Sequence, residues 1–438
     1  MTQVLSADWV LPVDGAPIED GAVAFEGGCI AAVGSASELG EGERFADSVI
    51  VPGLVNAHTH LEYAVYAGFG DGQPFGPWLR THIERKARID AEEFLAIARL
   101  GAAECLRSGV TTIADASFSG MAALAASELG LRGIVAIEVF GVEAGRAEDA
   151  RRRIAELKPA LDPRIQLGVS PHAPYSVSLE LYRAAYELGV PLVTHLAESV
   201  DEVDYLRDGS GPISAISEIE PSGLTPVRHL AAQGLLGPHL LAAHCVKVDR
   251  EEIALLAEHD VAVAHCPRSN AMLGCGFAPL KALRAAGLRI GLGTDSPAST
   301  PSFDLFEEMR AAVLAARGRE ERPDALAGWE ALELATLGAA RALHLEDEIG
   351  SLGPGKRADL AVVSLAGSPY LPWEDPAAAV VFGGSPDRVL LTLVDGEERY
   401  RKGGFGWHEL RRSAGAARAR LLHRKATRPS AEPVAPRT

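Results

Sequence analysis

The feature that most constrains the fold is an alternation of short apolar strands and helical segments that begins near residue 51. The apolar and β-branched runs predict eight buried strands, at 53–60, 111–117, 132–141, 164–173, 190–198, 240–246, 261–270 and 289–297. Between most of them lie apolar helical segments, one of which begins with Asp249 and Glu252 at the spacing of a capping box. Such an alternation predicts the α/β class, and within it a closed parallel (β/α)8 barrel, or TIM barrel.

The two ends of the chain have a different pattern. Residues 1–50 and 346–405 contain short strand-like runs between Gly and Pro turns, and a helix is expected at 329–345 before the second of them. The simplest arrangement joins the two ends in one small β-sandwich domain beside a barrel of residues 51–345. Residues 406–438 are rich in Arg and Ala and then in Pro, which predicts a basic helix followed by a disordered tail.

Charge and cysteine content exclude several classes of function. The net charge of −17 argues against broad binding to nucleic acid or to anionic membranes. The five cysteines include no CxxC pair, so neither a disulfide framework nor a four-cysteine zinc site is expected, and a reducing cytoplasm fits better. No signal peptide and no membrane span are expected either, because the apolar runs are too short.

Ionisable residues close several of the apolar strands. They are His58, His60, His172, His195, Glu198, His244 and Asp295. Burying such groups is costly unless they pair with another group or take part in the function of the protein. Since the carboxyl ends of the strands of a (β/α)8 barrel meet at one mouth, we expect these side chains to converge there.

The converging residues suit a metal. His58 and His60 are two positions apart in a strand, so they can share a face, while His195 and Asp295 can complete the ligand shell. Imidazole and carboxylate ligands favour one divalent ion, with Zn²⁺ as the first expectation and Fe²⁺ as the alternative. Such an ion lowers the pKa of bound water and can supply hydroxide near neutral pH.

Several stretches, taken together, resemble the metal-dependent deaminase branch of the amidohydrolase superfamily. They are "PGLVNAHTH" (52–60), "THLAES" (194–199), "AHC" (243–245), "HCPRSN" (265–270), "GTDSPAS" (293–299) and "GSLGPGKRADLAVV" (350–363). The resemblance covers nearly all of the chain to about residue 405. It implies a mononuclear site, because the fourth strand, "RIQLGVS", lacks the lysine that bridges two metals in binuclear members.

The resemblance also implies roles for individual residues. His58, His60, His195 and Asp295 match the metal ligands. Glu198 matches the acid/base residue, His244 and Asp295 would take the proton of the attacking water, and His172 matches a position that contacts substrate. The implied reaction is hydrolytic deamination of an aminated purine-type heterocycle, with release of ammonia.

The segment after His60 carries the prediction of a specific substrate. "HTHLEY" and "GQPFGPWLRTHIERK" resemble the aminodeoxyfutalosine deaminases of menaquinone biosynthesis, which convert a 6-aminopurine nucleoside-like compound to its 6-oxo form. Glu62 is then a candidate substrate contact, and so is Trp78, in a loop expected to begin at Phe75. Arg80 and Arg268 are candidates for holding the benzoate carboxylate of that substrate. Surface ion pairs remain the alternative for both arginines, and plain packing remains the alternative for the aromatic residues.

Other functions stay open. The runner-up is a deaminase of adenosine, S-adenosylhomocysteine or methylthioadenosine, followed by a deaminase of guanine or another heterocycle. A non-catalytic scaffold is disfavoured because no expected ligand is missing. The expected partner is a small heterocyclic molecule, with no nucleic acid and no membrane, and a homodimer is expected because dimers are common among relatives.

Further histidines and one glutamate do not fit the pattern of strand ends. Seven histidines are expected to face solvent or cap helices: His82, His229, His239, His259, His344, His408 and His423. His265 is expected to be a supporting or core residue. Glu138 either lines the pocket or is a buried, hydrogen-bonded carboxylate.

Overall fold

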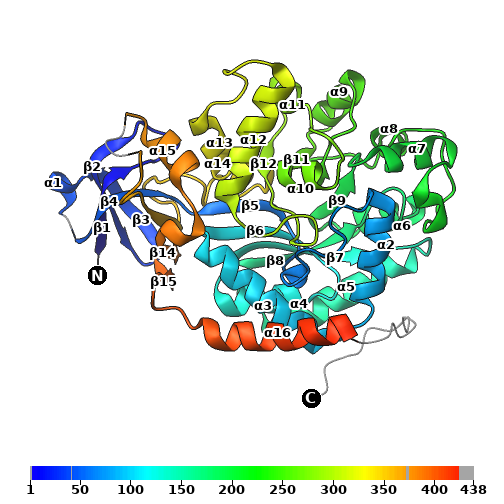
Figure 1. The fold of residues 1–438 in the computed structure, drawn as a ribbon, viewed down its shortest axis with the longest axis horizontal. Coiled ribbons are helices and arrows are strands. Elements are labelled where there is room, and N and C mark those ends of the chain that lie inside the picture. The colour runs from blue at the N-terminus through cyan, green and yellow to red at the C-terminus, as the bar shows by residue number, and fades with distance from the viewer. Residues whose placement is uncertain (1, 41, 371–373, 424–438) are drawn as a thin grey trace.

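The computed structural model describes residues 2–40, 42–370 and 374–423. Its larger sheet consists of eight strands in sequential order, enclosed by helices (Figure 1). The strands are β5 (Leu54–Thr59), β6 (Val110–Ser117), β7 (Arg132–Val139), β8 (Ile165–Pro171), β9 (Leu192–Leu196), β10 (Leu240–His244), β11 (Ala262–His265) and β12 (Ile290–Leu292). Each lies within or almost within one of the expected segments, so the predicted (β/α)8 barrel is confirmed.

The barrel closes between its first and last strands. The backbone N–H of Asp295 donates to the carbonyl of His58 at 2.9 Å, and Thr59 forms a parallel bridge with Asp295. The strands are buried on both faces, as parallel strands covered by helices must be. Closure therefore brings residues from opposite ends of the barrel sequence into contact.

Helices follow most of the barrel strands. They are α2 (Phe75–Lys86), α3 (Ala91–Arg107), α4 (Met121–Leu129), α5 (Gly145–Leu157), α6 (Leu179–Tyr186), α7 (Val200–Asp208), α8 (Pro226–Ala231), α9 (Arg250–Glu258), α10 (Pro267–Met272), α11 (Leu280–Ala285), α12 (Leu305–Glu320), α13 (Gly328–Leu334) and α14 (Leu337–Ala342). The capping box expected at α9 is present, because Asp249 and Glu252 each accept a backbone N–H of the other at 2.9 Å. This reciprocal bonding fixes where the helix begins.

The helix expected at 329–345 is in fact two helices, α13 and α14. Between them Thr336 has a non-helical backbone, with φ −134° and ψ −97°. The break leaves the carbonyl of Ala335 free to accept the backbone N–H of Val55, in β5, at 2.8 Å. The prediction of a single helix was wrong because the apolar period continues across the break. The contact with β5 that accompanies the break cannot be seen in the sequence of this segment.

The two ends of the chain share a second sheet, in the order β15-β14-β13-β4-β1-β2-β3. Its elements are β1 (Gln3–Val10), β2 (Ile18–Glu26), β3 (Cys29–Ser35), β4 (Glu43–Pro52), β13 (Leu360–Ser364), β14 (Val389–Val394) and β15 (Glu397–Arg401), with α1 (Ala36–Leu39) and α15 (Pro376–Gly383) beside them. Ile50 in β4 pairs with Val362 in β13, so the predicted joining of the two ends is confirmed. β4 continues to Pro52, slightly beyond the boundary expected at residue 50.

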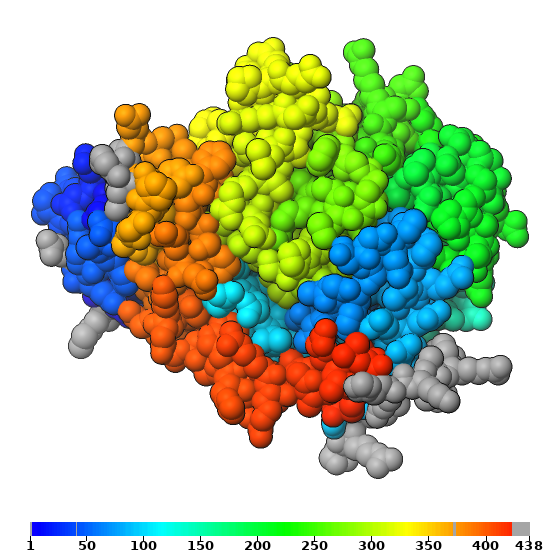
Figure 2. All heavy atoms as spheres, in the orientation of Figure 1, coloured from blue at the N-terminus to red at the C-terminus, as the bar shows by residue number. Residues whose placement is uncertain are grey.

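The chain then returns to the barrel as α16 (Trp407–His423), which runs along α3 (Figure 1). Figure 2 shows this orange-to-red segment along the lower edge of the molecule. Arg420 forms an ion pair with Glu93 of α3, and Arg418 donates to the carbonyl of Val65 at 3.3 Å. The disordered tail expected after the helix lies outside the described residues. Within the described part of the chain, every helix is too short or too polar to cross a bilayer.

A buried arginine ties the barrel to the second sheet. Arg132, at the start of β7, donates to Asp359 at 3.0 Å and to Asp395 at 2.6 Å, and its side chain is 7% exposed. Asp359, whose side chain is 1% exposed, directly precedes β13. Burial raises the pKa of Asp359, while Arg132 opposes that rise. The arginine therefore allows a buried carboxylate to stay ionised where the two domains meet.

We expect Arg132→Met to lower the free energy of unfolding by about 3–5 kcal/mol, because it removes the positive charge that faces the buried carboxylate of Asp359. Urea unfolding followed by circular dichroism measures the change. Arg151→Met is the matched control, since Arg151 is exposed and pairs with Glu148 one turn away, and it should cost about 0.5 kcal/mol or less. Equal stability of the two variants would contradict the role given to Arg132.

Candidate active site

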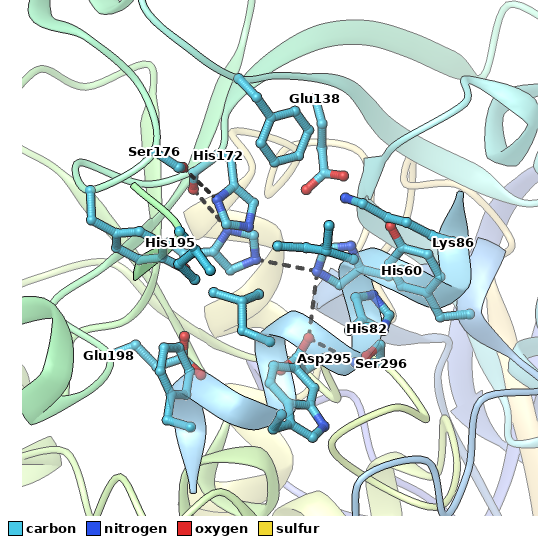
Figure 3. A pocket seen from close by; sticks show the side chains of 18 of the residues that line it. His60, His82, Lys86, Glu138, His172, Ser176, His195, Glu198, Asp295 and Ser296 are labelled. Carbon is cyan, nitrogen blue, oxygen red and sulfur yellow. Dashed lines mark hydrogen bonds and ion pairs between the residues drawn. The ribbon is translucent and has the colours of Figure 1, made fainter. Parts of the chain in front are cut away.

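A cavity opens at the carboxyl ends of the barrel strands, as expected (Figure 3). Its wall combines imidazoles, carboxylates and aromatic rings. The lining residues include His60, Tyr63, Phe75, Trp78, Leu79, His82, Lys86, Glu138, Phe140, His172, Tyr175, Ser176, His195, Glu198, Ile216, His244, Asp295 and Ser296. Of the residues singled out at strand ends, all but His58 line this cavity, and His58 lies directly against those that do.

Three histidines and one aspartate form a tight cluster at the floor of the cavity. Nε2 of His58 is 3.7 Å from Oδ1 of Asp295, and Nε2 of His60 is 3.5 Å from the same oxygen. Nε2 of His60 and Nε2 of His195 are 3.2 Å apart. The four predicted ligands therefore direct their free atoms toward one point, although His58 and His195 belong to β5 and β9, while His60 and Asp295 follow β5 and β12.

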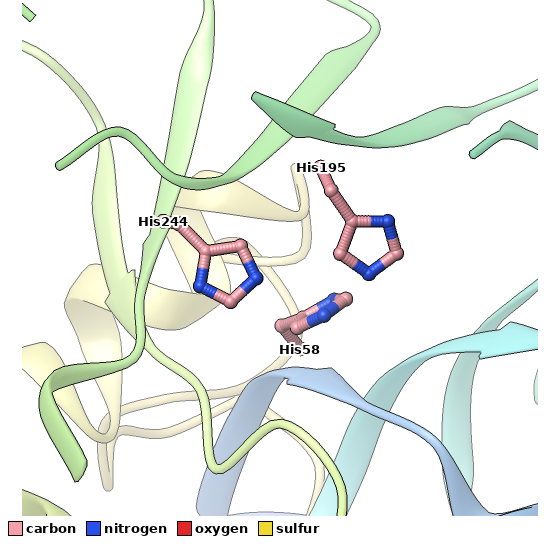
Figure 4. A group of neighbouring side chains, drawn as sticks. All are labelled: His58, His195 and His244. Carbon is pink, nitrogen blue, oxygen red and sulfur yellow. The ribbon is translucent and has the colours of Figure 1, made fainter. Parts of the chain in front are cut away.

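His244 lies beside this cluster. Figure 4 shows its ring facing those of His58 and His195, with ring centroids 5.6 Å from each. Nδ1 of His244 is 2.9 Å from Oδ1 of Asn270, while its Nε2 has no hydrogen-bond partner among the described residues. Nε2 is instead 3.8 Å from a carboxylate oxygen of Glu198.

The chemistry of this cluster fits a divalent metal. Both ring nitrogens of the fully buried His58 lack a hydrogen-bond partner among the described residues, an arrangement that is costly unless a ligand satisfies them. Burial, followed by the neighbouring imidazoles, lowers the pKa of His58 well below its ordinary value and that of His195 to about 3. The imidazoles are therefore neutral, as metal ligands must be.

Hydrogen bonds on the outer side hold the predicted ligands in orientation. Nδ1 of His60 lies 2.7 Å from the carbonyl of Ala116, and Nδ1 of His195 lies 2.8 Å from the carbonyl of His172. With Nδ1 donating to a carbonyl in each ring, Nε2 is left free to bind a metal.

Asp295 is held in the same way. Its Oδ2 accepts hydroxyl bonds from Ser269 at 2.6 Å and from Ser299 at 2.9 Å, so Oδ1 faces the histidines. Burial alone would raise the pKa of this carboxyl, but its polar surroundings, which include the donating hydroxyl of Ser269, hold it below its ordinary value. Asp295 is thus an anion aimed at the cluster.

The backbone at these strand ends is strained. Ala197, His244, Cys245 and Asp295 all have positive φ, between 46° and 76°, a region that costs energy for residues other than glycine. The turn at Ala197 and Glu198 is held by Glu202, whose carboxylate accepts both backbone N–H groups, at 3.2 and 2.8 Å. Glu202 is fully buried and thereby fixes the direction in which Glu198 leaves the strand.

Two of the predicted substrate contacts are at the cavity. His172 lines it, with Nδ1 2.7 Å from the hydroxyl of Ser176. Trp78 lines it as well, and its indole N–H donates to the carbonyl of Ala298 at 3.2 Å. Trp78 belongs to helix α2 rather than to the loop expected from the sequence.

Glu62 is placed elsewhere, which corrects the expectation that it contacts substrate. It is 1% exposed, and its carboxylate accepts the hydroxyls of Ser117 at 2.5 Å and Ser119 at 2.7 Å, with the backbone N–H groups of Ser119 and Ala122. Its hydrogen-bonding capacity is used in anchoring the connection from β6 to α4. A carboxylate that already accepts these hydrogen bonds has no acceptor position left for a ligand.

The two candidate arginines also lie away from the cavity. Arg80 is exposed on the outer face of α2. Arg268 is enclosed by the carboxylates of Glu308 and Glu307, each at 2.5 Å. The alternative of structural ion pairing holds for Arg268, and neither residue can hold a substrate carboxylate in this structure.

The sequence analysis missed His82 and Lys86, which line the cavity together with Trp78. The ring of His82 stacks on that of Trp78, with centroids 5.6 Å apart and an interplanar angle of 8°. The three residues are spaced four apart on α2 and so share one face of the helix. That spacing was the available signal, and it went unused because the segment was taken for a loop.

The remaining histidines divide into two groups. His259 caps α9, with Nδ1 2.9 Å from the carbonyl of Leu255, and His344 and His408 are exposed, as expected. His229 is 4% exposed within α8, so solvent exposure was the wrong expectation there. His82 is half-buried and lines the cavity. His265 is buried in β11, consistent with a core role, and the side chain of His423 lies outside the described residues.

Comparison with known proteins gives consistent results. The model of the amidohydrolase family matches residues 49–399. The 5-methylthioadenosine/S-adenosylhomocysteine deaminase of Symbiobacterium thermophilum is 36% identical, covering 91% of this chain and 93% of the relative. The 5′-deoxyadenosine deaminase of Methanothermobacter thermautotrophicus is 35% identical, covering 89% and 92%.

Solved structures are similar over the same length. A zinc-bound adenosine deaminase from Xanthomonas campestris superimposes with a TM-score of 0.85 at 29% identity, covering 96% of this chain and 98% of the other. The zinc-complexed atrazine chlorohydrolase TrzN from Arthrobacter aurescens gives a TM-score of 0.82 at 25% identity, covering 95% and 99%.

We expect His195→Ala to weaken metal binding by more than the roughly 10–100-fold that is lost when only a supporting residue is changed. Metal content after purification and the competition of a chelating dye for added Zn²⁺ measure the effect. His259→Ala, which removes a histidine from a helix end away from the cluster, should bind metal like the wild type. An unchanged affinity in His195→Ala would exclude His195 as a ligand.

Glu62→Ala should lower the free energy of unfolding by about 2–4 kcal/mol, because several donors buried around it lose their acceptor. The KM of the enzyme should stay within about 3-fold of the wild type, since Glu62 is outside the cavity. Denaturant unfolding and steady-state kinetics separate the two effects. A KM raised at unchanged stability would return Glu62 to the substrate side.

Proposed function

The chain belongs to the amidohydrolase family, and we propose that it is a metal-dependent deaminase of 6-aminopurine nucleosides. It is a hydrolytic enzyme that acts on C–N bonds. The observation that carries the deaminase proposal is Glu198, a buried carboxyl held beside both His244 and the ligand cluster. The nucleoside specificity is supported by relatives named as deaminases of methylthioadenosine, S-adenosylhomocysteine and 5′-deoxyadenosine.

His58, His60, His195 and Asp295 would hold the metal, for which zinc is favoured because the similar adenosine deaminase and chlorohydrolase structures contain it. A divalent ion in this position supplies the Lewis acidity that makes water a nucleophile near neutral pH. The protein contributes the fixed imidazoles and the enclosed cavity that direct the attack.

Glu198 supplies the proton that the heterocycle needs. Burial, and then the negative charge of Asp295, raises the pKa of Glu198 well above its ordinary value, which favours the protonated carboxyl. Donation of that proton to the ring nitrogen beside the amino-bearing carbon lets the ring accept the nucleophile without building up negative charge. Glu202 keeps the carboxyl in place by holding its backbone.

His244 is placed to transfer a proton from the attacking water to the departing amino group. Its Nε2 is free among the described residues and lies between Glu198 and the ligand cluster, while Asn270 holds Nδ1. Nε2 can therefore accept the proton of the attacking water and return it to the departing amino group. As the amino group leaves, the hydroxyl that remains on the carbon loses its proton to the carboxylate of Glu198, which regains the proton that it gave to the ring. The products are ammonia and the 6-oxo heterocycle.

The leading specific candidate is 6-amino-6-deoxyfutalosine, in menaquinone biosynthesis, and the resemblance of residues 58–63 supports it. Neither of the two arginines first considered for its benzoate lines the cavity. The named relatives favour the second candidate, a deaminase of methylthioadenosine, S-adenosylhomocysteine or 5′-deoxyadenosine. The proposal includes the cytoplasmic location and the homodimer expected from the sequence.

An ammonia-release screen tests the proposal with the zinc-loaded protein. The panel contains aminodeoxyfutalosine, 5′-deoxyadenosine, methylthioadenosine, S-adenosylhomocysteine, adenosine and guanine. We expect the highest kcat/KM with aminodeoxyfutalosine and measurable turnover of the other 6-aminopurine nucleosides. Turnover confined to guanine, or of no compound, would reject the nucleoside assignment.

Glu198→Gln should lower kcat by about 10²–10⁴-fold, because the amide keeps the shape of the side chain but cannot transfer the proton. Its metal content should equal that of the wild type, since Glu198 is not among the four ligands. Glu180→Gln, the same change at an exposed position of α6, controls for the substitution itself. Retention of wild-type kcat would remove Glu198 from the mechanism.

A further inference from the structure

One carboxylate of the cavity has no part in the chemistry described above. Glu138, near the end of β7, is 9% exposed, and its Oε2 has no hydrogen-bond partner among the described residues. Figure 3 shows the carboxylate directed into the cavity. A buried carboxylate oxygen without a donor is costly, so its presence at a cavity wall indicates a ligand that supplies the donor.

Lys86 provides the complementary group. Its Nζ lies 4.1 Å from the centroid of the Phe118 ring and 4.5 Å from that of Phe140, so the two rings hold the ammonium group near the cavity. Figure 3 shows the Lys86 amine and the Glu138 carboxylate close together. Burial lowers the pKa of Lys86 and raises that of Glu138, and the attraction between the two groups opposes both shifts. Both groups therefore keep hydrogen-bonding capacity for a molecule in the cavity.

The pair lies away from the acid/base residue. In Figure 3, Glu198 is on one side of the ligand cluster, and Glu138 and Lys86 are on the other. A heterocycle whose reacting carbon lies at the cluster, with its adjacent ring nitrogen toward Glu198, extends its remaining substituents away from Glu198. The substituent of a nucleoside is its sugar.

We propose that Glu138 and Lys86 form a subsite that binds the vicinal hydroxyls of the nucleoside sugar. This inference rests on the proposed nucleoside substrate. A hydroxyl is both donor and acceptor, so two adjacent hydroxyls can donate to the Glu138 carboxylate and accept from the Lys86 ammonium. The pair is neutral overall, which suits an uncharged diol better than a second anion.

A different occupant of Glu138 is a cation. Its carboxylate, together with nitrogens of His172 and His195, forms a group whose ligand atoms lie within 4.8 Å of one another. However, Nδ1 of His172 is bonded to Ser176 and Nδ1 of His195 to a backbone carbonyl, so His195 has only Nε2 left, which faces His60. The diol is therefore the better occupant, and the experiment below separates the two.

The test compares adenosine with 2′,3′-dideoxyadenosine as substrates of the zinc-loaded enzyme. The kcat/KM of the wild type should be roughly 10–100-fold higher for adenosine, which corresponds to the free energy of a hydrogen bond to a charged group. In Glu138→Gln and in Lys86→Met this preference should fall below about 3-fold, through loss of activity on adenosine. Glu84→Gln, an exposed glutamate on α2, is the matched control and should keep the wild-type preference.

Binding provides a second readout that needs no turnover. Calorimetric titration of the same proteins with inosine and 2′,3′-dideoxyinosine should show the same difference in Kd, present in the wild type and in Glu84→Gln and absent in the two subsite variants. If no nucleoside is deaminated but the inosine difference is present, the proposed reaction fails while the subsite stands.

Three results would overturn the subsite. The first is equal handling of the ribose and dideoxy compounds by the wild type in both assays. The second is a preference that survives in both subsite variants. The third is the loss of one metal equivalent per chain in Glu138→Gln, measured against the wild type, which would make Glu138 a metal ligand instead.

Discussion

The backbone hydrogen bond from Asp295 to His58 is the contact on which the site depends. It closes the barrel between β5 and β12 and, in doing so, sets two of the predicted ligands, His58 and Asp295, against each other. The outer hydrogen bonds of His60, His195 and Asp295 then decide which atom of each side chain remains free. A metal bound by that set also joins the first strand to the last, so binding free energy adds to the stability of the closed barrel.

The sequence allowed the barrel and the floor of its cavity to be predicted because both depend on local patterns. Each strand is a contiguous apolar run, and the ionisable residue at its end is next to it in the chain. Parallel order then brings His58, His60, His195, His244 and Asp295 together without any knowledge of side-chain packing. For the same reason the helix at Asp249 could be located from its cap alone.

The wall of the cavity could not be predicted in the same way. Whether Arg268 faces substrate depends on Glu307 and Glu308, which belong to another helix, and whether Glu62 does so depends on serines after β6. Helix α2 was missed because prolines and glycines around Phe75 resemble a loop. Proline is compatible with the first turn of a helix, where no intrahelical N–H bond is lost, and Pro77 lies in that turn.

The sheet built from both chain ends has a consequence for the order of events during synthesis. β4 emerges from the ribosome early, yet its neighbour β13 can pair with it only after the whole barrel has been translated, as the pairing of Ile50 with Val362 shows. Until then one edge of the amino-terminal strands is unpaired, and such edges invite association with other chains. The last-made strands therefore complete the first-made sheet, and aggregation during expression would depend on how quickly the finished chain brings them together.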